Sequence, residues 1–555
     1  MMDQLLTIAV LLPLAAAFLT FLFPANKPGA IRALAILTTG ISLLLTLYIF
    51  AQFDPVNSGY QFVTNAGHGI EWLPSLGVSL KFGVDGISMT LLLLVGIVSF
   101  CGALVSHEIH DRQKAYYILF LSLTTGISGT FCTTDMFFFY FFYEMAVIPM
   151  YLLIGMYGSL PPGKHGRTKE YATMKLTLYL TAGAVLALIG LLAMYFAGGR
   201  TFDMVELKQN LHLAGSMQKW VFACLLFGFG FLASMWPFHT WSPIGYAAAP
   251  TAASMMHAGV LKKLGAYGII RLALPLLPEG ARHWANLLAI LACFNILYAG
   301  WAALTQKDWK FVIGYSSVSH MGYVLLGIAT LNVIGVSGAV LLMFAHGVMA
   351  ALTFSLIGFF YHQTHNRMVP DLSGLARKIP FIGVCMVMAV MASSGLPGFA
   401  NFVSEVMVFI GAWSQGSLLF RIATICAIWG IVVTATYLLW AVRTSFFGPF
   451  DEKWNMLKDA TTAWQKLPYV LLIVVLLTVG FCPRLLTDII QKTVAAKIVK
   501  SELPVTVGDL RSEKVRGLET HAQQRGSGVA AAVPAARVRA EAPETGATTP
   551  SEVRR

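Results

Sequence analysis

Five ionisable residues stand inside long apolar stretches of the sequence: Glu144, Lys263, His320, His346 and Glu405. A charged side chain at the centre of a lipid bilayer costs at least ~2.5–3.5 kcal/mol, so such residues persist where they are paired, hydrated or used. Carboxyl, amine and imidazole groups all gain and lose protons. In a weakly polar medium, protonation of one group changes the pKa of the next group through Coulomb coupling. The series of acid, base, two histidines and acid therefore predicts a proton relay within a membrane.

The two glutamates differ in their surroundings. Glu144 is the single ionisable group in the oily segment MFFFYFFYEMAVIPMYLLIGM, which is typical of a relay carboxyl. A structural ion pair to a neighbouring helix is the alternative. Glu405 follows the segment SSGLPGF (residues 393–399), where a helix is expected to break, and this position suits the acceptance or release of protons. For Glu405 the alternative is a capping or packing role.

The basic residues form two groups. Lys263 and its neighbour Lys262 stand in MMHAGVLKKLGAYGIIR, and adjacent residues lie about 100° apart on a helix, so the two lysines cannot share a face. His320 and His346 lie in consecutive apolar segments. A lone buried histidine is more often a hydrogen-bonded structural residue, but two in succession, with serines close to His320, favour a hydrated proton chain. His257 is a weaker candidate.

The elements that hold these residues must be transmembrane helices. Hydrophobic residues make up 57% of the chain and charged residues 12%, whereas a soluble globular protein carries roughly 25% charged residues. Since each crossing needs about 20 apolar residues, the sequence predicts an all-α polytopic membrane protein of about fourteen transmembrane helices. The predicted spans are 5–23, 32–52, 84–105, 116–133, 136–157, 172–197, 218–236, 248–271, 284–304, 311–329, 333–360, 380–413, 420–442 and 467–486.

Proline and glycine interrupt this pattern at three places. Pro237 follows the seventh span, Pro250 opens the eighth, and residues 393–399 lie inside a run that is too long for one straight helix. Within lipid, broken helices are tolerated where they are buried in protein or line a hydrated cavity. The sequence therefore predicts broken helices near a transport path, with a simple proline kink as the alternative at each site.

The two ends of the chain differ. The first apolar segment lacks a basic n-region and follows Asp3, so it is expected to be a retained helix and not a signal peptide. With the N-terminus outside, the cytoplasmic loops would hold about sixteen Lys and Arg and the outer loops about seven. This excess predicts that both termini lie on the outer side of the membrane. Residues 1–490 are expected to form the transmembrane domain and residues 491–555 a polar, disordered extension.

Several function classes are excluded by what the sequence contains. The seven cysteines lie in apolar runs without CxxC or Cys/His ligand spacing, so neither a metal site nor an iron–sulfur cluster is expected in this chain. No dinucleotide-binding GxGxxG follows a strand and no haem motif is present, so we expect no cofactor and no redox chemistry in this chain. The net charge of +12 resides in short loops and the tail, which argues against nucleic acid as a partner.

The segments that carry these residues resemble a known family, the chain M (chain 4) antiporter-like membrane subunits of NADH–quinone oxidoreductase, respiratory complex I. The resemblance covers roughly residues 1–490. The matching segments are FGVDGISM (82–89), FFYEMAVIPMYLLIGMYG (141–158), WPFHTW (236–241), APTAAS (249–254), GVLKKLGAYGIIR (259–271), DWKFVIGYSSVSHMGYVLLGI (308–328) and SGLPGFANFVSE (394–405). It implies an antiporter-like fold with inverted repeats and broken helices seven and twelve.

The resemblance also implies roles for the residues. Glu144 would match the glutamate of the fifth helix, Lys263 the central lysine of the eighth, His320 and His346 the bridging histidines, and Glu405 the exit glutamate of the twelfth. The energy would come from quinone reduction in partner subunits of a respiratory complex with a peripheral redox arm. Those partners would carry flavin, iron–sulfur clusters and quinone.

The sequence departs from the family pattern at the seventh helix. The family usually has a lysine five residues before the proline of the PFHTW motif, and here that residue is Leu232. The usual LPDAH is replaced by SPIGY (residues 242–246), which removes an acid and a histidine. Glu144 therefore lacks its expected partner. Lys262 or Lys175 could supply the charge from another helix.

Three functions compete. The first is a proton-translocating subunit of complex I. The second is a subunit of a multi-subunit sodium/proton antiporter or inorganic-carbon uptake complex, which use relatives of this fold. The third is a membrane subunit of a related hydrogenase or of a rewired complex I. The departures at Leu232 and residues 242–246 keep the second and third open.

Overall fold

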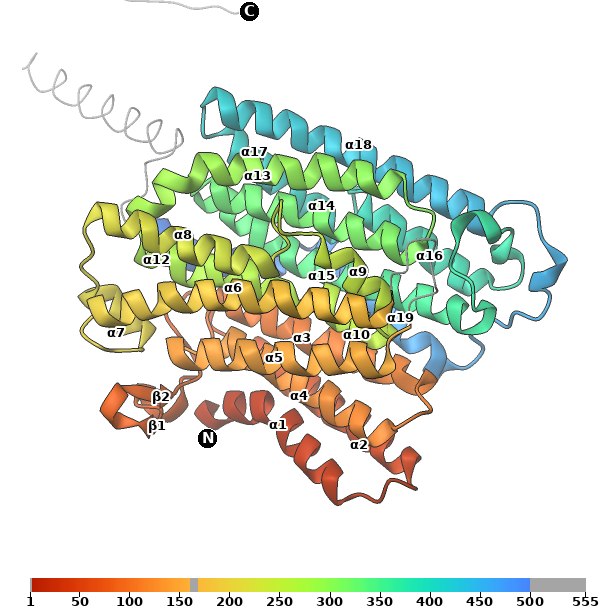
Figure 1. Ribbon diagram of the computed structural model, residues 1–555, viewed down its shortest axis with the longest axis horizontal. Helices are drawn as coiled ribbons and strands as arrows, with labels where there is room; N and C mark the ends of the chain where they lie inside the picture. Colours follow the sequence, from red (N-terminus) through yellow and green to blue (C-terminus); the bar gives the residue numbers. More distant parts are fainter. Residues whose placement is uncertain (1, 160–167, 500–555) are drawn as a thin grey trace, which may run out of the picture. The chain divides into compact units, whose positions relative to one another are not determined.

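The computed structural model describes residues 2–159 and 168–499, and the long apolar segments in these ranges form helices (Figure 1). Twelve helices in these ranges are long and apolar enough to cross a membrane. They are α1 (Met2–Leu22), α2 (Pro28–Gln52), α3 (Gly86–Val105), α4 (Gln113–Cys132), α5 (Met136–Tyr157), α6 (Lys169–Ala197), α8 (Gly215–Leu232), α13 (Pro278–Leu304), α14 (Trp309–Ala329), α15 (Val333–Thr364), α18 (Leu418–Phe446) and α19 (Ala463–Phe481).

Two further crossings are assembled from shorter pieces. One runs from Thr251 to Leu276 through α10 (Thr251–Met256), α11 (Lys263–Gly268) and α12 (Leu274–Leu276), joined by the π-helical turns η4 (His257–Leu261) and η5 (Ile269–Ala273). The other consists of α16 (Pro380–Ser393) and α17 (Ala400–Trp413). With these two, the described chain makes the fourteen crossings that the sequence predicts.

The interruptions fall where proline and glycine predict them. α8 ends at Leu232, and a loop that contains Pro237 separates it from the short helix α9 (Trp241–Ala248). Between α16 and α17 the backbone of Gly395 has φ of +66°, a left-handed conformation that favours glycine. Both predicted breaks are therefore confirmed. Pro250 precedes α10 as its N-cap, and the π turns around Lys263 are a feature that the sequence pattern did not predict.

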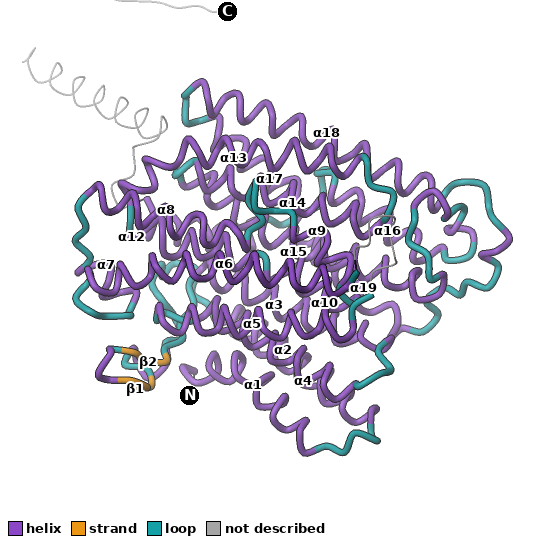
Figure 2. The backbone as a smooth tube through the Cα atoms, in the orientation of Figure 1, coloured by secondary structure: helices purple, strands orange, loops and turns teal. Residues whose placement is uncertain are grey.

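The middle of the bundle is formed by α3, α14 and α15. In their most apolar windows, 94%, 89% and 100% of the residues are buried, whereas the corresponding share is 39% in α6 and α18. The outer helices expose large apolar side chains such as Phe196 and Trp429, as lipid-facing helices do. Figure 2 shows most loops at the two ends of the helices. Polar residues on α14 and α15 therefore lie far from bulk water.

Helix α15 brings the central residues together. It packs against α3, α10, α14, α17 and α19. Gly259 in η4 and Gly347 in α15 allow the two backbones to approach closely, because a Cβ atom on Gly347 would lie 2.6 Å from the carbonyl oxygen of Gly259. This close approach places His346 beside the helix that carries Lys263.

Small elements cover the end of the bundle where α3 and α5 begin. They are the antiparallel hairpin β1 (Ile70–Leu73) and β2 (Val78–Leu80), the short helix α7 (Met204–Asn210), the helix α20 (Arg484–Val494) and the π turn η9 (Ala495–Val499). The 3₁₀ turns are η1 (Thr64–Gly67), η2 (Pro74–Leu76), η3 (Ser106–Glu108), η6 (Val369–Asp371), η7 (Leu375–Arg377) and η8 (Glu452–Trp454). Carboxylate side chains cap the helices here: Asp85 accepts hydrogen bonds from the first turn of α3, and Asp135 does so for α5.

The C-terminal end of the described chain remains helical beyond the predicted domain boundary at residue 490. Helix α20 packs against α3 and α15, and Thr493 Oγ1 accepts a hydrogen bond from the backbone N–H of Gly86 at 3.0 Å. Residues up to 499 therefore belong to the transmembrane unit. The rest of the predicted extension, residues 500–555, lies outside the described residues.

Candidate functional site

Lys263 and His346 meet in the middle of the bundle. Lys263 Nζ lies 2.9 Å from His346 Nδ1 and also donates to the carbonyl oxygen of Ala258 on its own helix. Lys263 is fully buried and His346 is 1% exposed. His346 Nε2 has no hydrogen-bond partner within the described residues. The lysine and the histidine can therefore exchange a proton directly, and the histidine has a second nitrogen free for the next step.

His320 lies next to His346 on the neighbouring helix α14. The centroids of the two imidazole rings are 5.2 Å apart. His320 Nδ1 lies 2.8 Å from the carbonyl oxygen of Ser316, and Nε2 lies 3.0 Å from that of Ser393. Carbonyl oxygens only accept hydrogen bonds, so both contacts are satisfied when the ring carries both protons. His320 therefore has a hydrogen-bond acceptor at each ring nitrogen, although it is buried away from water.

Glu405 completes the row from beyond the break in the α16–α17 crossing. Its Oε1 lies 3.9 Å from His320 Nε2, and its Oε2 has no hydrogen-bond partner in the described chain. The break makes room for this carboxyl, since a Cβ atom on Gly395 would collide with Oε2. The break between α16 and α17 therefore provides the space that the carboxyl of Glu405 occupies.

Lys263, His346, His320 and Glu405 thus form a row contributed by four different helical elements, α11, α15, α14 and α17. Each of these four side chains is at least 98% buried. Ionisable groups buried to this depth are expensive to retain unless they are paired or used. A row of this kind can pass protons laterally through the interior of the protein.

Glu144 stands apart from this row. It lies on α5, is half-buried, and its carboxylate accepts a hydrogen bond from Tyr140 on the same helix. None of the ion pairs in the described residues involves Glu144. The row therefore does not include this glutamate.

The auxiliary candidates have partners of other kinds. Lys262 Nζ lies 3.3 Å from Ser242 Oγ and 3.4 Å from Ser317 Oγ, and therefore contacts the altered SPIGY segment. Lys175 Nζ lies 5.8–5.9 Å from the centroids of two tyrosine rings on α6. His257 is buried between aromatic rings without a hydrogen-bond partner in the described chain. Neither lysine forms an ion pair with Glu144 in this structure.

A buried charge cluster was missed by reasoning from the sequence. Asp85 Oδ2 accepts from Arg271 Nη1 and from Lys497 Nζ, both at 2.6 Å. Burial by itself raises the pKa of Asp85, but the charges of Arg271 and Lys497 outweigh it and hold that pKa far below its ordinary value. Arg271 and Lys497 lie 186 and 412 residues after Asp85 in the sequence, so no local pattern indicates the cluster. Within residues 2–159 and 168–499, no three His, Cys, Asp or Glu side chains gather as a metal site would require.

Comparison with known proteins gives a consistent result. The family described as "NADH:quinone oxidoreductase/Mrp antiporter, TM" matches residues 133–430. The chain is 38% identical over 450 residues to NAD(P)H-quinone oxidoreductase chain 4 2 of Microcystis aeruginosa, covering 80% of this chain and 79% of that protein. It is 35% identical over 511 residues to NADH-quinone oxidoreductase subunit M of Rhodobacter capsulatus, covering 89% and 96%.

A solved structure has the same fold. A chain of respiratory complex I from Thermus thermophilus, with bound NADH, superposes with a TM-score of 0.78 at 27% sequence identity. The match covers 89% of this chain and 99% of that chain. Both chains therefore share the arrangement of helices over almost their whole membrane domain.

Proposed function

Because this chain belongs to the NADH:quinone oxidoreductase/Mrp antiporter family, as a relative of chain 4 (subunit M), we propose that it moves protons along Lys263, His346, His320 and Glu405. It is a multi-pass membrane subunit of an NAD(P)H–quinone oxidoreductase complex, a proton-translocating enzyme. The observation that carries the proposed path is the row of four buried groups at the crossing of four helices.

The proposed transfer uses groups that can both hold and release a proton. Lys263 gives a proton to Nδ1 of His346. The imidazole of His346 then releases a proton from its unpartnered Nε2 to His320. His320 holds it between two carbonyl oxygens and passes it to Glu405, which has an unpaired oxygen to receive it. Each transfer changes the local charge and so alters the affinity of the next group for a proton.

Glu144 has a different place in this proposal. A half-buried carboxyl in the membrane without an ion-pair partner in the described chain needs a partner or water. We propose that Glu144 serves proton transfer as a separate carboxyl, outside the row of four. Lys262, which is held by Ser242 and Ser317, is the proposed substitute for the lysine that Leu232 replaces, and Lys175 and His257 are auxiliary candidates.

The surroundings of the chain follow from its family. The proposed complex uses flavin, iron–sulfur clusters and quinone in partner subunits, and none of these is expected in this chain. The proposed location is a bacterial inner membrane with both termini on the periplasmic side, because the opposite loops carry the excess of Lys and Arg. Alkaline phosphatase fused to the C-terminus would be active in this orientation and inactive in the reverse one.

The experiment that tests the proposal is a gentle detergent purification of the tagged chain, followed by identification of the proteins that accompany it. Flavin, iron–sulfur and quinone-site subunits are expected, together with NADH- or NADPH-driven proton uptake by the reconstituted complex. Glu144→Gln and Lys263→Met should each lower that uptake at least about tenfold. If both variants pump as the unaltered complex does, the chain is a structural spacer and the proposed relay is wrong.

One alternative has a specific observation in its favour. The family includes Mrp antiporters, and Leu232 and the SPIGY segment depart from the pattern expected of a complex I subunit. A cation/proton antiporter or an inorganic-carbon uptake complex would co-purify with other membrane subunits or a soluble non-redox partner. In that case the four buried groups would serve transport without an electron-transfer drive.

A further inference from the structure

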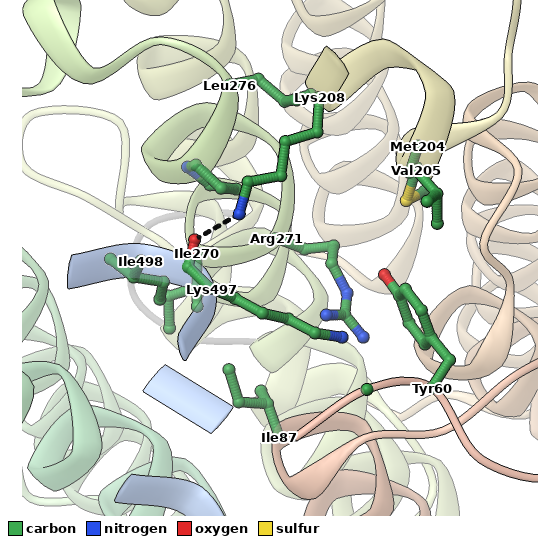
Figure 3. Close-up of a pocket in the computed structure, with 12 residues that line it drawn as sticks. Tyr60, Ile87, Met204, Val205, Lys208, Ile270, Arg271, Leu276, Lys497 and Ile498 are labelled. Carbon is green, nitrogen blue, oxygen red and sulfur yellow. Dashed lines mark hydrogen bonds between the residues drawn. The ribbon is translucent and has the colours of Figure 1, made fainter. Parts of the chain in front are cut away.

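A pocket of about 340 Å³ lies at the end of the bundle where α3 begins (Figure 3). It is separate from the proton row, since Arg271 in its wall lies about two helical turns beyond Lys263 on the same crossing. Its walls come from five parts of the chain: the loop before α3, the first turn of α3, helix α7, the end of the α10–α12 crossing and the π turn η9. None of the proposed steps in proton transfer uses it.

The pocket carries more positive than negative charge. Three cationic side chains line it: Lys208, Arg271 and Lys497. In the described chain, the carboxylate that pairs with them is Asp85, through Oδ2 to Arg271 and Lys497. Oδ1 of Asp85 is occupied by two backbone N–H groups and a serine hydroxyl at the start of α3. Asp85 is therefore saturated, and among the described residues no further carboxylate forms an ion pair with Lys208, Arg271 or Lys497.

Donors remain free on these cations. Arg271 is 7% exposed, its Nε donates to the hydroxyl of Tyr267 at 2.9 Å, and its Nη2 has no hydrogen-bond partner in the described residues. Lys208 Nζ donates one hydrogen bond, to the carbonyl oxygen of Lys497 at 3.1 Å, although an ammonium group has three N–H bonds. Figure 3 shows the end groups of Arg271 and Lys497 directed into the same space, opposite the side chain of Tyr60.

Tyr60 does not neutralise this charge. Its ring centroid lies 3.4 Å from Lys497 Nζ, which is a cation–π contact. Burial raises the pKa of Tyr60 to about 12, so the phenol stays neutral. Burial lowers the pKa of Lys497 to about 8 against the opposing effect of Asp85, so the ammonium form still predominates at pH 7. The positive excess therefore persists at physiological pH.

We propose that this pocket binds a phosphate group, either the phosphodiester of an anionic lipid headgroup or inorganic phosphate. A guanidinium with one free edge and an ammonium beside it are the donors that recognise phosphate oxygens. The apolar part of the wall, which includes Ile87, Met204 and Leu276, fits the glycerol portion of a lipid next to its phosphate. The bound group would link α3, α7 and η9 and so fasten the C-terminal end of the domain.

The test measures the melting temperature of the detergent-purified complex that contains the full tagged chain. Phosphatidylglycerol, phosphatidylcholine and inorganic phosphate are titrated separately, with sodium chloride at matched ionic strength to account for screening. The test variant is Lys208→Gln with Lys497→Gln, which leaves Arg271 paired with Asp85. The control is Lys219→Gln with Lys492→Gln, two exposed lysines near the same end of the bundle.

We expect the unaltered complex to be stabilised by phosphatidylglycerol, by phosphate or by both, and the concentration needed to rise about tenfold or more in the test variant. Stabilisation by phosphatidylglycerol alone identifies a lipid headgroup, and stabilisation by phosphate alone identifies the free ion. The proposal is overturned if neither exceeds sodium chloride or phosphatidylcholine, or if the test and control variants respond alike. Should the double variant fail to assemble, Lys208→Gln alone, on an exposed lysine, gives the same comparison.

Discussion

The contact between His320 and Glu405 makes a quantitative prediction for Glu405→Gln. Glutamine keeps the size of the side chain and its capacity for hydrogen bonds, but removes the negative charge. In the unaltered protein, whenever Glu405 is ionised, a proton that arrives on His320 is attracted by a carboxylate oxygen 3.9 Å away. At an effective dielectric constant of about 20, this attraction is worth about 4 kcal/mol. Its loss lowers the occupancy of the protonated His320 by up to about a thousandfold.

The expected result is a loss of proton translocation of at least about tenfold. The loss is smaller than the change in occupancy of protonated His320, because other steps limit turnover in the unaltered protein. The assay reconstitutes the complex into vesicles and records proton uptake with a pH-sensitive dye together with quinone reduction. Quinone reduction is measured with and without an uncoupler, so that protons moved per quinone reduced can be compared. Glu279→Gln, at an exposed glutamate in the first turn of α13, is the control and should change neither quantity.

The result that refutes this reasoning is specific. If the Glu405→Gln complex assembles normally, as judged by its subunit content and size, and still moves as many protons per quinone reduced, then Glu405 lies outside the proton path. The row would then end at His320. Glu405→Asp offers a second check, since it keeps the charge and should retain more translocation than Glu405→Gln.

Three further predictions concern other residues. Lys263→Met removes the sole side-chain hydrogen-bond partner of His346 in the described chain, and proton uptake should fall at least about tenfold in the same vesicle assay. Unchanged uptake would count against the relay. Leu232→Lys combined with Lys262→Leu should restore the uptake that Lys262→Leu alone loses, and a double variant as inactive as the single one would show that Lys262 is not the substitute. Asp135 has a pKa raised by burial to about 6, so its ionisation destabilises the fold increasingly as pH rises from about 4 to 6, and Asp135→Asn should gain about 1 kcal/mol more stability at pH 8 than at pH 5. Thermal melting at the two pH values measures this difference, and an equal effect at both would contradict it.

The membrane spans could be predicted because lipid imposes a simple length rule on apolar sequence. The predicted spans agree with the helices to within a few residues, and the breaks at Pro237 and at residues 393–399 follow from the chemistry of proline and glycine. The last membrane-crossing helix, α19, begins four residues before the predicted span 467–486 and ends five residues before its end, at Phe481 ahead of Pro483. The hairpin β1–β2 and helix α7 escaped prediction because their elements are only three to seven residues long.

The residues of the candidate site could be predicted from the sequence, but the contacts between them could not. Ionisable residues in apolar sequence stand out one by one, and Lys263, His346, His320 and Glu405 do lie in one row. The sequence could not indicate that Glu144 lies outside this row. The pairing of Asp85 with Arg271 and Lys497 escaped it as well, because such contacts depend on how distant helices pack.

The π turn η4 (His257–Leu261) has a consequence for the rotational phase of its helix. A π turn holds one more residue than the α turn it replaces, so the chain that follows is rotated relative to an uninterrupted helix. Adjacent residues differ by about 100° around the axis. If the same residues were wound as ordinary α turns, Lys263 would therefore be rotated by about 100° away from His346, and Lys262 would take that direction. Which of two adjacent lysines faces the histidine is thus decided by a single residue of helical register, upstream of both.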